Sequence, residues 1–322
     1  MKRLLSVALM VIVSLVGMAM VNPVIAQQSV PTSEKAKQPP GPVLGPVNLG
    51  PVINTKLREA EVSFTADGKT MYFNCQVRPG PGGIDICVTR LIGTLEDGRW
   101  TTPEIVAPGV ISLTDTFDVE PLISPDGKKL FFQSGMMGPN RPGGYGSGDI
   151  WYSENVDGVW QAPKNLGPPF NSPFGDHCLS FSADGNEAFW ASNRPGGFGD
   201  NDIWTSRKVD GIWQAAVNLG PNVNSPYSEH HALPSPDGKS LYVTSGRPGG
   251  FGGEDIYVTT RDHTGTWGPM VNLGPLVNSD KDDRCPSLTP DSRFFLFDSE
   301  RPGGYGSKDI WWVYYDQIKD IR

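Results

Sequence analysis

One phrase of eleven residues recurs along this chain, and this repeat constrains the fold more than any other feature. The phrase Arg-Pro-Gly-Gly-aromatic-Gly-x-x-Asp-Ile-aromatic occurs four times, and a shortened version precedes them. Two further phrases, Asn-Leu-Gly-Pro and Ser-Pro-Asp-Gly-Lys with its variants, recur in step with it. The five aspartates of the first phrase lie 64, 53, 53 and 54 residues apart, at Asp85, Asp149, Asp202, Asp255 and Asp309. Such a period indicates five copies of one structural unit.

Each copy predicts four short strands separated by turns. In the fourth copy these are residues 232–235, 240–245, 255–260 and 266–273, with a glycine-rich loop between the second and third. Alternating aromatic and β-branched residues between turn residues favour strands over helices. Repeated four-stranded units arranged radially form a β-propeller. The sequence therefore predicts an all-β, five-bladed β-propeller with four antiparallel strands in each blade.

The two ends of the repeat region indicate how the ring closes. The fifth copy stops after the strand at 309–315, whereas residues 43–50 carry an Asn-Leu-Gly strand before the first copy begins. We expect this N-terminal strand to complete the last blade, so that no open sheet edge remains there. The predicted propeller therefore spans residues 43–322.

The N-terminal residues have the features of an export signal. Residues 1–26 combine a basic start, a long apolar run and a small-residue cleavage site, as signal peptides do. An uncleaved anchor is the alternative, because the apolar run is long. Residues 27–42 are polar and rich in proline, which predicts a flexible tail. The chain is thus expected to be exported, either to the periplasm or to the outside of the cell.

Composition excludes some classes of partner. The formal net charge is −8, and 38% of the residues are hydrophobic. A negative chain is a poor match for nucleic acid, because nonspecific binding depends on lysine and arginine releasing counterions. After the leader, the sequence contains no apolar run long enough to span a membrane. We expect a monomer that binds neither nucleic acid nor a cofactor.

The repeated turns, glycine-rich loops and Asn-Leu-Gly-Pro strands resemble the WD-like β-propeller repeats of the TolB type. The resemblance covers nearly all of residues 43–322. It implies an exported, noncatalytic platform that binds a protein or a cell-envelope glycan on its loop face. TolB itself resembles a six-bladed propeller with an extra domain, whereas this chain has five repeats and no such domain. The Tol-complex role is therefore not carried over.

Two aligned columns of charged residues are candidate ligand-binding positions. A carboxylate begins the first strand of every copy, at Glu59, Asp118, Asp176, Glu229 and Asp283. An arginine begins every glycine-rich loop, at Arg78, Arg141, Arg194, Arg247 and Arg301. Two interpretations stay open: salt bridges between blades that clamp the loops, or a site for an anion or glycan. His177 and His230, one position after the carboxylate, are further candidates for ligand binding.

A third column differs from copy to copy and should face the central channel. Two positions after the carboxylate, the copies carry Glu61, Glu120, Cys178, His231 and Cys285. Cys178, His231 and Cys285 are of metal-ligand types, although packed thiols and a hydrogen-bonded histidine would also explain them. Glu61 and Glu120 could instead form the carboxylate pair of a glycoside hydrolase. This enzyme is the alternative to the binding platform.

The other two cysteines lie in the first copy. Cys75 replaces a serine and Cys87 replaces an aromatic residue in neighbouring strands, and only this copy changes both columns. In an oxidising compartment such a pair can form a disulfide, and we predict one here. Two free thiols that happen to lie close together are the alternative. Cys178 and Cys285 are expected to remain separate thiols, because they belong to nonadjacent blades.

Overall fold

The computed structural model describes residues 45–76, 83–136 and 139–322, which form five antiparallel sheets. Blade 1 consists of β2 (Glu59–Phe64), β3 (Thr70–Gln76), β4 (Ile84–Arg90) and β5 (Glu104–Ile105). Blade 2 consists of β6 (Asp118–Ile123), β7 (Lys129–Ser134), β8 (Asp149–Val156), β9 (Val159–Trp160) and β10 (Lys164–Asn165). Blade 3 consists of β11 (Asp176–Phe181), β12 (Glu187–Ser192), β13 (Asp202–Val209), β14 (Ile212–Trp213) and β15 (Val217–Asn218).

The last two blades follow the same plan. Blade 4 consists of β16 (Glu229–Pro234), β17 (Ser240–Ser245), β18 (Asp255–Thr260) and β19 (Val271–Asn272). Blade 5 consists of β20 (Asp283–Leu288), β21 (Phe294–Ser299), β22 (Asp309–Tyr314) and the N-terminal β1 (Val47–Asn48). A single turn of 3-10 helix follows at Tyr315–Gln317. Across the described ranges, no helix has the length and apolar character needed to cross a membrane.

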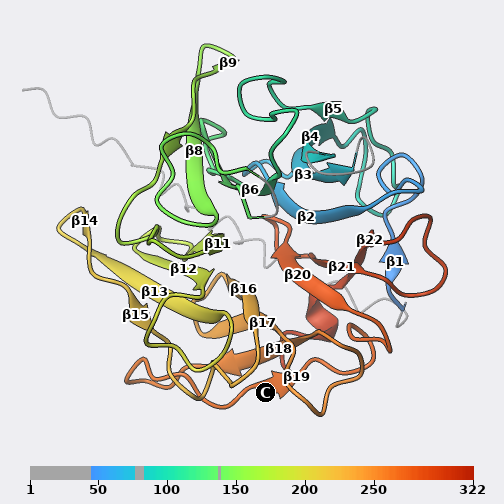
Figure 1. Cartoon of the computed structure of the whole chain (residues 1–322). Helices are drawn as coiled ribbons and strands as arrows, with labels where there is room; N and C mark the ends of the chain where they lie inside the picture. The colour runs from blue at the N-terminus through green and yellow to red at the C-terminus, as the bar shows by residue number, and fades with distance from the viewer. Residues whose placement is uncertain (1–44, 77–82, 137–138) are drawn as a thin grey trace, which may run out of the picture. The chain divides into compact units, whose positions relative to one another are not determined.

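The blades form a ring with their first strands innermost (Figure 1). The buried apolar side chains gather into five clusters, and each cluster combines residues of two neighbouring blades. One cluster, for example, joins Ile86 of blade 1 to Phe132 of blade 2. Because each sheet buries its faces against the next, the hydrophobic core is distributed around the ring. The predicted five-bladed propeller is confirmed.

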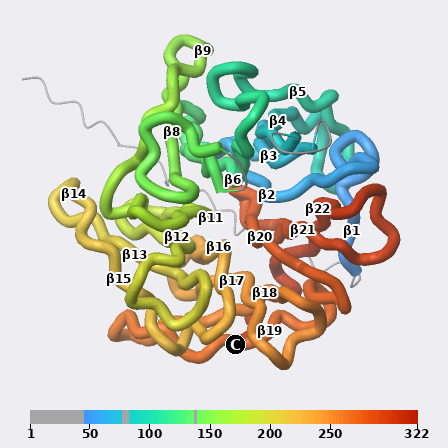
Figure 2. Tube along the Cα trace, in the orientation of Figure 1, coloured from blue at the N-terminus to red at the C-terminus, as the bar shows by residue number. Residues whose placement is uncertain are grey.

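The N-terminal strand closes the ring, as predicted. β1 pairs antiparallel with β22, with Val47 opposite Trp312 and Asn48 opposite Trp311. Figure 2 shows these two ends of the propeller side by side. The next residue continues the pairing, because the Leu49 amide donates a hydrogen bond to the Ile310 carbonyl at 3.1 Å. Residues 43 and 44, like the predicted signal peptide and tail, lie outside the described residues.

The innermost and outermost strands differ from the sequence-based prediction. In blade 4 the first strand starts earlier, at Glu229. The predicted outer strand at 266–273 is reduced to Val271–Asn272 and an isolated bridge between Arg261 and Trp267. Pro269 lies between these two pieces and has no amide hydrogen for the ladder. Proline is tolerated here because the strand is at the sheet edge.

Candidate functional site

The five innermost strands share a backbone irregularity at the column that differs between copies. The pairing register shifts there in every blade, which is a β-bulge. Each strand places one non-glycine residue in the left-handed region, with φ of 52°, 59°, 56°, 41° and 55° at Glu61, Glu120, Cys178, His231 and Cys285. Such a residue costs on the order of 1 kcal/mol. Strain repeated at the same place in every blade marks this column as a candidate site.

All five of these residues line one axial cavity of about 230 Å³. The remaining lining comes from the residues that follow the bulge in each inner strand, such as Val62 and Leu233. The cavity thus extends along the axis from the bulges toward the ends of the inner strands, where the tight turns begin. This end of the axis is opposite to the loop face, on which the sequence predicts the binding surface.

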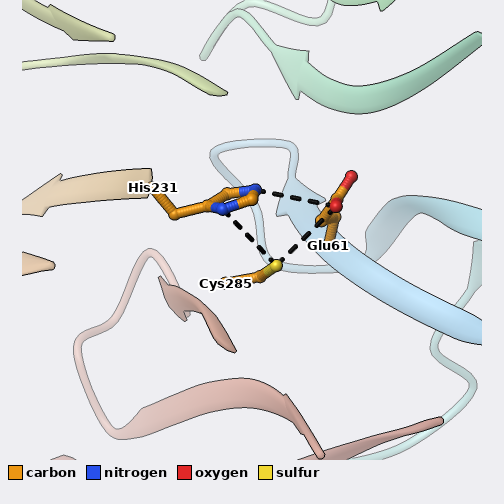
Figure 3. A group of neighbouring side chains, drawn as sticks. All are labelled: Glu61, His231 and Cys285. Carbon is orange, nitrogen blue, oxygen red and sulfur yellow. Dashed lines mark hydrogen bonds and ion pairs between the residues drawn. The ribbon is translucent and has the colours of Figure 1, made fainter. Parts of the chain in front are cut away.

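Glu61, His231 and Cys285 point toward one another from β2, β16 and β20 (Figure 3). The Cys285 sulfur lies 3.6 Å from His231 Nδ1 and 3.7 Å from Glu61 Oε1. His231 Nε2 lies 3.6 Å from the same Glu61 oxygen. This axial triad therefore brings a thiol, an imidazole and a carboxylate to one point on the axis.

Glu120 and Cys178 form a second group around the same imidazole. The Cys178 sulfur lies 3.3 Å from His231 Nδ1 and 3.2 Å from Nε2. Its backbone amide donates to Glu120, and its sulfur lies 2.9 Å from His177 Nδ1. Cys178 and Cys285 are both buried free thiols. The predicted convergence of all five residues on the channel is therefore present, and the sulfurs of Cys178 and Cys285 both contact the imidazole of His231.

Burial and neighbouring charges perturb these groups strongly. Burial, together with the carboxylates of Glu120 and Asp298, raises the pKa of Glu61 to about 8. Burial opposes ionisation of Glu120 as well, yet the imidazoles of His177 and His231 lower its pKa to about 2. Burial lowers the pKa of His231 to about 4 and raises the pKa of the Cys285 thiol. Perturbed titratable groups that share a cavity indicate a functional site.

The repeated carboxylates and arginines pair with each other. Arg194 lies 2.6 Å from Asp176, and the side chain of Asp176 is fully buried. The same guanidinium donates to the backbone carbonyls of Pro169 and Phe170, in the linker that leads into the blade. Equivalent pairs are Arg141 with Asp118, Arg247 with Glu229, and Arg301 with Asp283. Glu59 is instead bonded by Thr55, and its predicted partner Arg78 lies outside the described residues.

These pairs correct one detail of the prediction. Each carboxylate and its arginine belong to the same blade, whereas the sequence suggested bridges between blades. The reason is that the second strand of a blade runs antiparallel to the first, so its end lies beside the start of the first strand. In blade 3, Asp176 pairs with Ser192, and Arg194 follows two residues later. The clamp joins a loop to a linker and occupies the groups that a ligand would need. This geometry favours the structural interpretation over ligand binding.

The two histidines of the adjacent column also have protein partners. His177 is buried, and its Nε2 lies 3.3 Å from the Asn201 side-chain oxygen. His230 Nε2 lies 2.9 Å from Glu254, which also pairs with Arg284. Both histidines therefore belong to polar networks on the loop side of the bulges. Their proposed ligand-binding role receives no support from these contacts.

Cys75 and Cys87 are joined by a disulfide in the structure, with their Cα atoms 5.8 Å apart. The bond links β3 to β4 within blade 1. It lies in the apolar cluster between blades 5 and 1, together with Phe73 and Trp312. The bond therefore cross-links two strands of blade 1, the blade that packs against the closing blade 5.

Sequence reasoning missed Asn74, which connects the two channel glutamates. Its side-chain amide donates to Glu61, and its oxygen accepts the Glu120 amide at 2.9 Å. It also missed Lys308, which is buried and lies 2.9 Å from Asp298 near the axis. These residues could have been found from their polarity, because Asn74 and Asp298 occupy equivalent positions in second strands whose neighbouring residues are mostly buried and apolar.

Sequence reasoning also missed the aromatic residues of the glycine-rich loops. Four of them are exposed, by 55%, 48%, 51% and 50%, at Tyr145, Phe198, Phe251 and Tyr305. The aspartate that begins the third strand holds each loop; Asp202, for instance, accepts the Phe198 amide at 2.8 Å. Tyr227, in the linker to blade 4, is also exposed. The loop approaches this linker so closely at Gly199 that a side-chain Cβ there would lie 1.7 Å from the Tyr227 carbonyl oxygen. Loop and linker therefore pack together and display aromatic rings on one face.

Comparisons with known proteins establish the fold only. No protein-family model matches the chain, and no curated protein matches it. An α-L-arabinofuranosidase of Podospora anserina, solved with cellotriose, is similar over 85% of this chain and 94% of its own, with a TM-score of 0.52 and 14% identity. A TolB-type protein of Agrobacterium tumefaciens is similar over 80% and 79%, with a TM-score of 0.46 and 18% identity. A Dyadobacter fermentans protein of unknown function is similar over 87% of this chain and 84% of its own, with a TM-score of 0.48 and 15% identity. At 14% identity, the similarity to the arabinofuranosidase shows the fold alone.

Proposed function

We propose that this protein is an exported, noncatalytic propeller that binds a protein partner on its loop face. The observation that carries the proposal is the set of exposed aromatic rings, one on each described glycine-rich loop: Tyr145, Phe198, Phe251 and Tyr305. Large aromatic side chains on one face are characteristic of protein interfaces. Their repetition in four blades sets them apart from single exposed apolar residues, which are common.

The loops that carry the rings are held in place before any partner arrives. The Phe198 amide is bonded to Asp202, and the Tyr145 amide is bonded to Asp149 at 2.6 Å. In each loop the arginine at its start is clamped to a buried carboxylate. A ring on a fixed loop loses little conformational entropy when it binds, which favours affinity.

The composition of these loops favours a protein partner over a glycan. Around the rings the chain is made of glycine, serine, asparagine and aspartate, as in 145–149 and 198–202. Rigid aromatic anchors surrounded by small, adaptable polar residues are the composition of antibody paratopes. The cell-envelope glycan stays as the second class of partner, to be distinguished by experiment.

Export is supported by two features. Residues 1–26 have the pattern of a signal peptide, and the Cys75–Cys87 disulfide suits an oxidising compartment. The resemblance to TolB-type repeats agrees with this location and with a binding role. It rests on the repeated phrases of the sequence.

The glycoside hydrolase alternative is less well supported by the geometry. Its carboxylates, Glu61 and Glu120, line a cavity of about 230 Å³, whereas ligand pockets usually measure about 300–1,000 Å³. Asn74 and the Cys178 amide already bond to these carboxylates. A glycosidic bond flanked by two sugar rings would need a more open site.

Site-specific photo-crosslinking tests the proposal in the cell envelope. A photoreactive residue in place of Phe198 or Phe251 should give a discrete crosslinked protein. The matched control is Ile212, which is 68% exposed on the β13–β14 hairpin, away from the glycine-rich loops. The partner identified should then bind purified protein at least about 10-fold more weakly when both rings are changed to alanine.

The result also separates the two partner classes. Crosslinks from position 212 alone, or unchanged affinity in Phe198→Ala/Phe251→Ala, would refute a binding role for the loop face. If no protein crosslinks and the purified chain instead binds a glycan array in a ring-dependent way, the partner is a glycan. Hydrolysis of a glycan that is lost in Glu61→Gln and Glu120→Gln would favour the enzyme.

A further inference from the structure

We propose that the axial triad of Glu61, His231 and Cys285 binds one divalent transition-metal ion, with Zn²⁺ as the best match. This site is separate from the aromatic loop face, and the inference does not depend on the function proposed there. The triad lies at the bulged column of β2, β16 and β20.

The spacing of the three ligand atoms fits a metal centre. Around Zn²⁺, bonds of about 2.0–2.3 Å at tetrahedral angles place ligand atoms about 3.3–3.8 Å apart. In the axial triad the Cys285 sulfur lies 3.7 Å from Glu61 Oε1 and 3.6 Å from His231 Nδ1, whereas the 3.6 Å contact between His231 and Glu61 Oε1 is made by the other ring nitrogen, Nε2. Each residue offers one ligand atom, and these atoms lie within 4.8 Å of one another. Three protein ligands with an open fourth position are a common zinc arrangement.

The chemistry of the three groups selects the type of ion. A thiolate and an imidazole bind Zn²⁺ and similar ions in preference to Ca²⁺ or Mg²⁺, which take oxygen ligands. A second carboxylate, that of Glu120, lines the same cavity as Glu61. A cation would offset the repulsion between two carboxylates in a buried setting.

The backbone is arranged for such a site. In each of the three strands the bulge puts the ligand residue in the left-handed region, at φ of 52°, 41° and 55°. The Cys285 amide is bonded to Thr244 at 3.1 Å, and Asn74 holds Glu61. Thr244 belongs to blade 4 and so holds Cys285 from the neighbouring blade, whereas Asn74 belongs to the same blade as Glu61. The ligands are thus positioned by contacts both within and between blades.

The position of the triad indicates what the ion would do. Cys285 belongs to blade 5, the closing blade, whereas Glu61 and His231 belong to its two neighbours, blades 1 and 4. β1 closes blade 5 at its outer edge. An ion on the axis would tie the inner edge of the same blade to its two neighbours.

Cobalt substitution and zinc titration of the full-length protein test the site. Metal-depleted wild-type protein should bind one Co²⁺ per chain with thiolate-to-cobalt absorption, and one Zn²⁺ measured by competition with a chromophoric chelator. Cys285→Ser should abolish the thiolate absorption, and His231→Ala should weaken zinc binding by at least about 100-fold. Zinc should raise the Tm of the wild type and leave that of Cys285→Ser unchanged.

Cys178→Ser is the matched control, because Cys178 is an equally buried thiol beside the same imidazole. It should keep one cobalt with thiolate absorption. Loss of binding in Cys178→Ser, with or without loss in Cys285→Ser, would overturn the assignment of the three ligands. Absence of stoichiometric metal binding by the wild type would show that the axial triad is a hydrogen-bonded packing cluster. Circular dichroism of each metal-free variant establishes that it is folded.

Discussion

Leu49 provides a direct test of how the propeller closes. It follows β1, is 2% exposed, and belongs to the apolar cluster between blades 5 and 1. Leu49→Ala deletes buried methyl groups and leaves a cavity, which costs about 2–5 kcal/mol for a leucine in a packed core. If β1 docks as the structure describes, the free energy of unfolding should fall by about 3 kcal/mol.

The repeat supplies an internal reference for this substitution. Leu273 follows β19 in blade 4, is also 2% exposed, and its amide bonds to Ile256 at 3.1 Å, as the Leu49 amide bonds to Ile310. Leu273→Ala should therefore cost a similar amount. Val52→Ala, at a residue 42% exposed, serves as the surface control and should change stability by less than about 0.5 kcal/mol.

Urea and thermal unfolding followed by circular dichroism measure these costs. A loss of about 3 kcal/mol corresponds to a fall in Tm of about 5 °C, because an unfolding entropy of about 2.1 cal/mol/K per residue amounts to about 0.6 kcal/mol/K for a propeller of this size. If Leu49→Ala changed stability by less than about 0.5 kcal/mol while Leu273→Ala cost about 3 kcal/mol, β1 would not be docked in solution. The ring would then close by some other contact.

Three further predictions concern the clamps, the disulfide and one turn. Asp176→Ala removes the acceptor of Arg194 and of the Ser172 amide, both at 2.6 Å, and should cost about 3–5 kcal/mol in urea unfolding; additivity with Arg194→Met would contradict a coupled pair. Thiol labelling of the denatured protein, read by intact mass, should modify two cysteines before reduction and four after it; four before reduction would exclude the disulfide between Cys75 and Cys87. Ser292 has φ of 55° where other copies have glycine, so Ser292→Gly should stabilise the protein by about 0.5 kcal/mol and Gly185→Ser should destabilise it; the reverse signs would show that backbone strain is not the cause.

The fold could be predicted because its signals are local and repeated. The Ser-Pro-Asp-Gly turns fix where strands end, and the missing outer strand of the fifth copy reappears before the first. The same alignment brought Cys75 and Cys87 to neighbouring strands. The outer strands were overestimated because edge strands tolerate interruption, as at Pro269.

The site could be predicted only as a set of residues. The aligned column named Glu61, Glu120, Cys178, His231 and Cys285, but their bulged backbone has no signal in the sequence. Glycine often indicates a left-handed backbone conformation, whereas glutamate, cysteine and histidine do not, so the sequence gives no reason to predict positive φ at these positions. Their mutual distances depend on the curvature of the whole ring, which no single repeat contains. The exposed loop aromatics were missed for a similar reason, since alternation does not tell an exposed ring from a core ring.

The contrast between columns that repeat and columns that differ follows from where each lies in the ring. The carboxylate and arginine of one clamp serve their own blade, so five identical copies do not compete. At the axis, five side chains share one space, and five carboxylates there would repel one another strongly in a buried setting. A column of five carboxylates is therefore disfavoured, and the mixture present instead brings a carboxylate, a thiol and an imidazole, three kinds of metal ligand, close together. Because the axial side chains of all five repeats share one narrow space, these residues differ between repeats. The same difference allows a site to form on the axis.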